Sequence, residues 1–129
     1  PAGYRATGFL KRADGQWVYA NESGALVGGW VRDGGSWYYL DPATKVMATG
    51  WVADGGSWYY LTGSGAMATG WVNDGGSWYY LNAFGQMATG WLNVGGSWYY
   101  LSPSGVMLTG THVINGRTYV FDANGIWVG

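Results

Sequence analysis

The six-residue string Gly-Ser-Trp-Tyr-Tyr-Leu occurs four times without change in this chain of 129 residues. The copies begin at Gly35, Gly56, Gly76 and Gly96, which shows that one unit of about 20 residues has been duplicated. Each copy follows a Gly-Trp pair and is followed by one methionine, at Met47, Met67, Met87 or Met107. A period this short indicates a repeat architecture in which each unit contacts mainly its neighbours.

Both ends of the chain repeat the template with substitutions. Phe9 stands at the first Trp position and Trp17 at the second, whereas Thr111, Thr118 and Trp127 replace the two Trp and the Met at the other end. Terminal repeats of an array depart from the consensus in this way. We therefore predict a single array over 1–129, with degenerate end repeats at 1–28 and 110–129 and regular repeats across 29–109.

Turn residues separate two aromatic, β-prone runs in every unit. Asp33-Gly34-Gly35 is one such turn, and its position predicts a β-hairpin. Side chains alternate along a strand, so Trp37 and Tyr39 share one face while Tyr38 and Leu40 share the other. An isolated two-stranded hairpin is marginally stable in water, so the hairpins must stack. The sequence predicts an all-β solenoid of about six stacked hairpins.

Composition excludes several classes of function. The net charge is −1, and the 13 charged side chains make up 10% of the chain, which leaves no basic surface for nucleic acid. One His and no Cys cannot form a closed zinc site. Most of the seven acidic residues stand in turns, as Asp33 and Asp54 do, so no catalytic carboxylate pair is indicated. We expect no enzyme, no metal site and no cofactor.

The 10 Trp and 11 Tyr are more than hairpins of this length need for a core. Aromatic rings arranged around a cavity turn their negative faces inward and attract a bulky cation, at about 0.5 to 2 kcal/mol per contact. A quaternary ammonium group, which donates no hydrogen bond, fits such a cavity. A core made only of packed rings accounts for the composition equally well.

The stretch Thr69-Gly70-Trp71-Val72-Asn73-Asp74-Gly75-Gly76-Ser77-Trp78-Tyr79-Tyr80-Leu81, with its continuation to Gly90, resembles the choline-binding repeat of Gram-positive surface proteins and phage lysins. The resemblance covers nearly the whole chain. It implies a left-handed hairpin solenoid in which choline binds between consecutive repeats, against two Trp of one hairpin and a Tyr and a Met of the next. The implied sites are Trp30, Trp37, Tyr60 and Met67; Trp51, Trp58, Tyr80 and Met87; and Trp71, Trp78, Tyr100 and Met107.

Two further sites depart from the family pattern. Phe9, Trp17, Tyr39 and Met47 would form a weaker cage, because Phe is a poorer cation-π partner than Trp. At the other end, Trp91 and Trp98 meet Val120 where a Tyr is expected. A third ring is present there only if Tyr119 or Trp127 turns toward them.

The resemblance also implies partners and a location. Choline or phosphocholine on wall and lipoteichoic acids would hold the protein non-covalently at the bacterial cell wall surface after secretion. Choline-induced homodimers are expected, because family members often dimerise. Several weak cages on one array would act together on a polymer that carries many copies of the ligand.

Two other functions remain open from the sequence. Related aromatic repeats bind glucans, usually with a Tyr-Tyr-Phe-Asp strand, and the run from Asn115 to Asp122 leans toward that pattern. A structural spacer, whose rings only hold the hairpins together, would bind no ligand at all.

Overall fold

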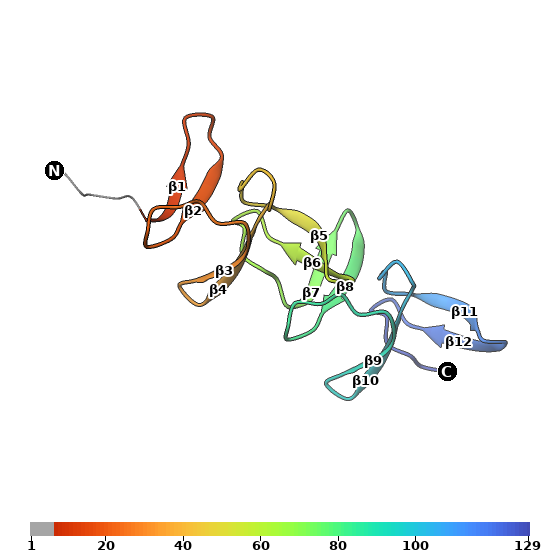
Figure 1. The fold of residues 1–129 in the computed structure, drawn as a ribbon. Helices are drawn as coiled ribbons and strands as arrows, with labels where there is room; N and C mark the ends of the chain where they lie inside the picture. Colours follow the sequence, from red (N-terminus) through yellow and green to blue (C-terminus); the bar gives the residue numbers. More distant parts are fainter. Residues whose placement is uncertain (1–6) are drawn as a thin grey trace, which may run out of the picture. The chain divides into compact units, whose positions relative to one another are not determined.

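The computed structural model describes residues 7–129, so the first six residues of the first predicted repeat lie outside the description. Contacts within the chain define two compact units, residues 1–68 and residues 69–129. Across residues 7–129, twelve short strands pair into six antiparallel hairpins (Figure 1). The predicted all-β class and the predicted series of hairpins are confirmed.

In the first unit the strands are β1 (Gly8–Lys11), β2 (Trp17–Ala20), β3 (Gly29–Asp33), β4 (Ser36–Leu40), β5 (Gly50–Asp54) and β6 (Ser57–Leu61). In the second unit they are β7 (Gly70–Asp74), β8 (Ser77–Leu81), β9 (Gly90–Val94), β10 (Ser97–Leu101), β11 (Gly110–Ile114) and β12 (Arg117–Phe121). The strands pair two by two along the chain: β1 with β2, β3 with β4, β5 with β6, β7 with β8, β9 with β10 and β11 with β12.

One register recurs in the regular hairpins. In β3–β4, Trp30 lies opposite Tyr39 and Arg32 lies opposite Trp37. Residues directly opposite each other in an antiparallel pair project from the same face, so these four side chains share one face of the hairpin. The register places Trp71 opposite Tyr80 in the same way.

A two-residue loop closes each regular hairpin. In β3–β4 this loop is Gly34-Gly35, with φ of 59° and 85°. Positive φ at both positions is the signature of a type I′ turn, whose twist matches that of the flanking strands, and side chains with a Cβ rarely adopt it. Asn115-Gly116 closes β11–β12 in the same conformation. The predicted hairpin turns therefore lie where the sequence places them.

A second turn follows each hairpin and returns the chain toward the next one. In the fourth repeat the Asn82 side-chain oxygen accepts hydrogen bonds from the backbone N–H groups of Phe84 and Gln86, both at 2.9 Å. An Asx turn of this kind is a frequent use of Asn and Asp in loops. The turn ends at the methionine of the repeat, and Met87 forms an isolated bridge with Leu81.

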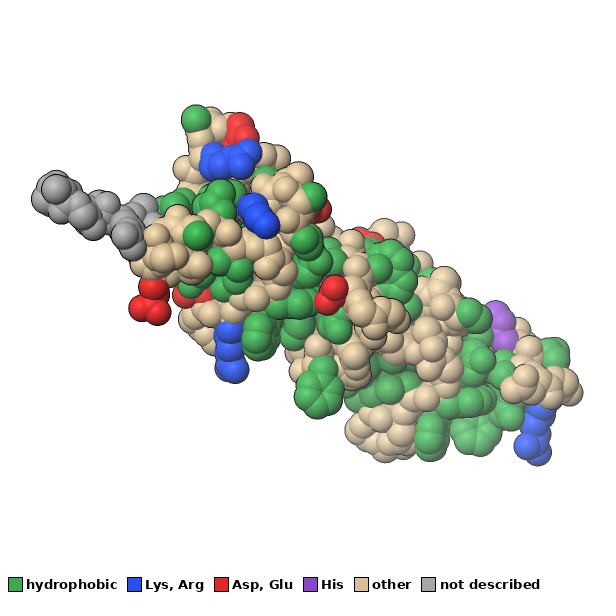
Figure 2. Space-filling view, viewed as in Figure 1, with side chains coloured by type: hydrophobic (Ala, Val, Ile, Leu, Met, Phe, Trp, Pro, Cys, Tyr) green, Lys and Arg blue, Asp and Glu red, His purple; other side chains and the backbone are tan. Residues whose placement is uncertain are grey.

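In both units the core contains the leucine that ends the second strand of a hairpin. Leu40, Leu61, Leu81 and Leu101 are fully buried, at 0% exposure. Many of the large aromatic side chains, in contrast, remain partly exposed. Figure 2 shows hydrophobic side chains over much of the surface on the face in view. The rings are therefore only partly used as core.

Candidate functional site

The first tryptophan of a repeat packs between two tyrosines. The Trp71 ring lies 5.0 Å from the ring of Tyr80 in its own hairpin and 4.9 Å from the ring of Tyr99 in the next hairpin, centroid to centroid. Both contacts are edge to face, at interplanar angles of 69° and 63°. Edge-to-face packing is a favoured geometry for aromatic pairs and fixes the orientation of the indole.

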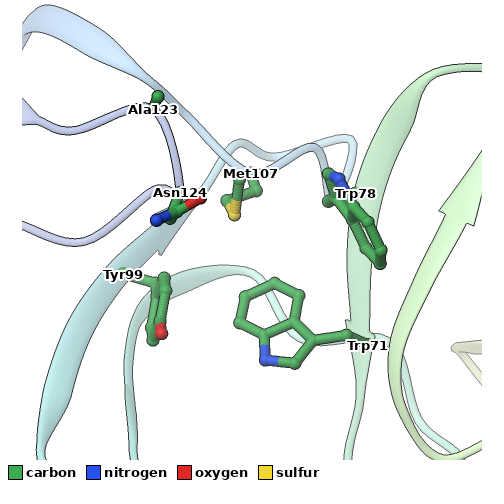
Figure 3. A pocket seen from close by; sticks show the side chains of 6 residues that line it. All are labelled: Trp71, Trp78, Tyr99, Met107, Ala123 and Asn124. Atoms are coloured by element: carbon green, nitrogen blue, oxygen red, sulfur yellow. The ribbon is translucent and has the colours of Figure 1, made fainter.

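A pocket of about 280 Å³ lies beside this stack in the second unit. Its lining residues are Trp71, Trp78, Tyr99, Met107, Ala123 and Asn124. Figure 3 shows Trp78 and Tyr99 on opposite sides of the opening, with Trp71 and Met107 between them. The lining thus comes from three consecutive repeats: two indoles from the first, a Tyr and a Met from the second, and a turn from the third.

Backbone contacts hold the methionine in place. The N–H of Met107 donates to the carbonyl oxygen of Trp78 at 2.8 Å, which ties the two repeats together beside the pocket. Gly125, in the turn of the last repeat, lies against the Met107 sulfur so closely that a Cβ at that position would overlap it. The Gly125 φ of 85° is a second reason for glycine at this position.

The first unit contains a corresponding pocket of about 300 Å³, lined by Phe9, Trp17, Tyr38, Met47 and Ser64. Its rings stack in the same way, because Phe9 lies 4.9 Å from Tyr19 and 4.7 Å from Tyr38. The N–H of Met47 donates to the carbonyl oxygen of Trp17 at 2.8 Å. The structure therefore brings together three of the four residues predicted for the weaker cage.

Trp30, Trp37 and Met67 form the next group of the first unit together with Tyr59. The Trp30 ring lies 4.9 Å from the Tyr59 ring, and the N–H of Met67 donates to the carbonyl oxygen of Trp37 at 2.7 Å. The indole N–H of Trp30 also donates to a carboxylate oxygen of Asp54 at 3.1 Å. This group repeats the arrangement around Trp71.

Trp91, Trp98, Tyr119 and Trp127 also come together, in the second unit. The Trp91 ring lies 4.8 Å from Tyr119, 6.0 Å from Trp127 and 6.4 Å from Trp98. Both candidates for a third ring therefore face Trp91. Trp127 stands at the repeat position of the methionines, and its backbone N–H donates to the backbone carbonyl oxygen of Trp98.

A different tyrosine from the one expected lies in each of these groups. Tyr100 does not line the pocket beside Trp71, which Tyr99 does; Tyr100 instead lies 5.1 Å from Trp91 of its own hairpin. The same shift by one residue replaces Tyr60 with Tyr59, and Tyr39 with Tyr38.

The tyrosine implied by the resemblance lies on the same alternation face in consecutive hairpins. Trp71 shares a face with Tyr80, its cross-strand partner. The next hairpin stacks in the same sense and presents its other face, which carries Tyr99 rather than Tyr100. Head-to-tail stacking always joins opposite faces of consecutive units.

The remaining predicted group draws residues from both units. In the first unit, Trp51 lies 4.9 Å from Tyr60, and Trp58 is 47% exposed. In the second unit, Tyr80 packs against Trp71, and Met87 lies against Gly105.

Sequence reasoning missed the turn residues that complete each pocket. Ser64 and Asn124 occupy the same position in the turns of the third and sixth repeats, and each lines a pocket. The available signal was the turn glycine that recurs two residues before a methionine, as Gly65 does before Met67; in the structure Gly65 lies against Met47 of the preceding repeat. The sequence does not give the distance and rotation between consecutive repeats, so it does not show which turn lines which cage.

The electrostatics of the pockets favour a cation. Of the described residues that line the pocket beside Trp71, none is charged, and its walls are two indoles, a phenol and a thioether. Ring faces carry negative electrostatic potential, so a cation gains cation-π energy there without needing a hydrogen-bond acceptor. Behind Trp30, burial raises the pKa of the Tyr39 phenol, and the negative charges of Asp54 and Asp41 raise it further. That phenol therefore stays neutral.

Other kinds of site find no support in residues 7–129. Among them, no three His, Asp or Glu side chains are grouped so as to hold a metal ion. No helix within this range has the length and hydropathy of a membrane span.

Family models match more than half of the chain. A model described as choline-binding repeat matches residues 68–111, and one described as putative cell wall binding repeat matches residues 28–42 and 49–67. Among curated proteins, no sequence matches significantly.

Solved structures of similar proteins agree with this result. CbpJ from Streptococcus pneumoniae TIGR4 is 43% identical, with a TM-score of 0.91 over 95% of this chain and 46% of that chain. Choline-binding protein F from Streptococcus pneumoniae is 39% identical, with a TM-score of 0.90 over 95% and 42%, and has also been solved in complex with ipratropium. The endolysin of phage Cp-1, complexed with choline, is 33% identical, with a TM-score of 0.66 over 95% and 37%.

The chain spans less than half the length of these solved chains. The family matches lie between residues 28 and 111, a range that includes Trp71, Trp78, Tyr99 and Met107. The chain belongs to the choline-binding repeat family.

Proposed function

We propose that this chain binds choline and related quaternary ammonium groups in the cages between its repeats. The observation that carries the proposal is the uncharged cage of Trp71, Trp78, Tyr99 and Met107. Three ring faces and a thioether solvate a trimethylammonium group, which has no proton to donate and needs no acceptor. By the same geometry, Trp30, Trp37, Tyr59 and Met67 form a second cage, and Phe9, Trp17, Tyr38 and Met47 form a weaker one.

The ligands of two relatives support this proposal. The phage Cp-1 endolysin was solved with choline, and choline-binding protein F was solved with ipratropium, which is also a quaternary ammonium compound. Both ligands carry the same cationic centre on very different substituents. A cage that recognises only that centre accommodates both.

We further propose that the physiological ligand is phosphocholine on teichoic acids and that binding anchors a secreted protein non-covalently to the bacterial cell wall. Cages repeated along one chain suit a polymer with many copies of its ligand, because later contacts form at high effective concentration. In this proposal the repeats bind and do not catalyse. Choline-dependent dimerisation is part of the same expectation, and sedimentation with and without choline measures it.

Retention on a trimethylammonium matrix tests the binding proposal. The protein should be retained, eluted by free choline, and left on the matrix by the same concentration of sodium chloride. Elution by sodium chloride would mean simple ion exchange and contradict the proposal. Elution by a soluble glucan instead of choline would favour the carbohydrate-binding alternative.

A further inference from the structure

One cage has a carboxylate bonded to its wall. Asp54, the last residue of β5, accepts a hydrogen bond from the indole N–H of Trp30 at 3.1 Å. Trp30 contributes its ring to the cage with Trp37, Tyr59 and Met67. An indole N–H points outward in the plane of the ring, so the carboxylate lies at the edge of the indole and not over its face.

The same repeat position differs at the cage of Trp71 and at the cage of Phe9. Val94, the last residue of β9, stands there for the cage of Trp71, so that indole has no carboxylate at this position. For the cage of Phe9 the equivalent residue is Asp33, at the end of β3, but the Phe9 ring has no N–H to donate. Neither of these two cages therefore joins an indole donor to a carboxylate at this position.

A carboxylate in this place strengthens cation binding in two ways. A hydrogen bond from the indole N–H to a charged acceptor increases the electron density of the ring, which favours the cation-π contact. The negative charge would also attract a cation on the ring face. At a separation on the order of 7 Å and an effective dielectric of about 40 to 80, this Coulomb attraction corresponds to roughly a two- to sevenfold gain in affinity.

A positive charge on the same hairpin makes this carboxylate more important. Arg32 is exposed on β3, directly opposite Trp37 and on the same face. Without Asp54, this guanidinium would oppose a bound cation. The cage of Trp71 carries neither charge, because Asn73 stands opposite Trp78.

We propose that Asp54 is an affinity-determining residue, which makes the cage of Trp30 bind quaternary ammonium groups more tightly than the cage of Trp71. This inference rests on the proposed function of the cages. The cages then differ in affinity for the same ligand. The difference depends on the last residue of the first strand in the next hairpin, which is Asp54 for the cage of Trp30 and Val94 for the cage of Trp71.

The test is a choline titration followed by NMR of the tryptophan indole N–H groups, which reports each cage separately once Trp30 and Trp71 are assigned by substitution with Phe. Asp54→Asn keeps an acceptor for the indole N–H and removes only the charge. Val94→Asp introduces the carboxylate at the other cage. Glu22→Gln removes one negative charge from an exposed turn of the first repeat and serves as the charge-matched control.

Asp54→Asn should weaken choline binding at Trp30 by roughly two- to sevenfold and leave Trp71 unchanged. Val94→Asp should strengthen binding at Trp71 by a similar factor, and Glu22→Gln should change neither site. Equal affinities at Trp30 in the wild type and in Asp54→Asn would overturn the inference while leaving the proposed function intact. Indole signals that do not respond to choline at all would overturn the proposed function itself.

A neutral ligand distinguishes an electrostatic role of Asp54 in cation binding from a purely structural role as a link between hairpins. In 3,3-dimethyl-1-butanol a carbon atom replaces the choline nitrogen, so the shape is kept and the charge is lost. Asp54→Asn should leave binding of this alcohol unchanged, and its effect on choline should shrink as the salt concentration rises. Equal weakening of both ligands would identify a structural role and overturn the inference.

Discussion

The rings of Trp71 and Tyr99, which belong to consecutive hairpins, meet edge to face with 4.9 Å between their centroids. Tyr99 therefore closes the cage next to Trp71, whereas the adjacent Tyr100 packs against Trp91 of its own hairpin. Two neighbouring tyrosines in an invariant string thus have different roles. Tyr99 lines the pocket of the preceding repeat, and Tyr100 packs against the indole of its own repeat.

Removing the Tyr99 ring should weaken choline binding at this cage. Tyr99→Ala deletes one cation-π contact, worth about 0.5 to 2 kcal/mol, which corresponds to a loss of about 2- to 30-fold in affinity. Tyr99→Phe keeps the ring and should retain most of the binding. Indole NMR of Trp71 during a choline titration measures the effect. A loss in Tyr100→Ala, with none in Tyr99→Ala, would restore the assignment expected from the sequence.

The sequence alone was sufficient for the hairpins and insufficient for the cage. Strand positions followed from local rules, because a turn such as Gly34-Gly35 and an aromatic run are recognisable without knowledge of the rest of the chain. The choice between Tyr99 and Tyr100 depends on how one hairpin stacks on the next. No local rule fixes that orientation, and for the same reason Asn124 was not assigned to the pocket.

The turn glycine against the methionine should be essential for the cage. Gly125→Ala combines a positive φ with overlap between the new Cβ and the Met107 sulfur. Gly116→Ala is the matched control, since its φ of 81° is similar and its Cβ would have open space. Both should lose about 1 to 2 kcal/mol to backbone strain.

Gly125→Ala should lose roughly 1 to 3 kcal/mol more, because the methionine is displaced. Thermal melting measures the difference between the two variants, and only Gly125→Ala should also weaken choline binding at Trp71. Equal losses of stability with unchanged binding would contradict the role of Gly125 in positioning Met107.

Oxidation should impair the cages through the methionines. The chain has four Met, all at the same repeat position, and Met47 and Met107 each line a pocket. Conversion to the sulfoxide places a polar oxygen against the bound trimethylammonium group and the rings. Mild peroxide treatment should lower choline affinity in proportion to the sulfoxide found by mass spectrometry.

A variant with all four Met replaced by Leu provides the control for oxidation. It should keep the apolar wall and bind choline both before and after peroxide. Loss of binding in this variant after peroxide would show that oxidation of tryptophan, and not of methionine, impairs the cages.

Acid should weaken the turn of the second repeat. The Asp41 carboxylate accepts hydrogen bonds from the backbone N–H groups of Thr44 and Ala43, which lower its pKa. A carboxylate with a depressed pKa contributes stability above its unfolded pKa, about 3.9, and loses that contribution as the pH falls through the folded value.

Asp41→Asn should therefore flatten the fall in melting temperature below about pH 4, because Asn holds the same turn in the fourth repeat without titrating. The reciprocal change, Asn82→Asp, should add acid sensitivity. Identical pH profiles for the wild type and both variants would show that the turn carboxylate does not govern stability in acid.

Binding of quaternary ammonium groups by the cages is tested by a choline titration followed by thermal melting. A ligand that binds only the folded protein raises its melting temperature in a concentration-dependent way. The melting temperature should rise saturably with choline and should not rise in this way with the same concentration of sodium chloride. A melting temperature that responds equally to choline and to sodium chloride would contradict it.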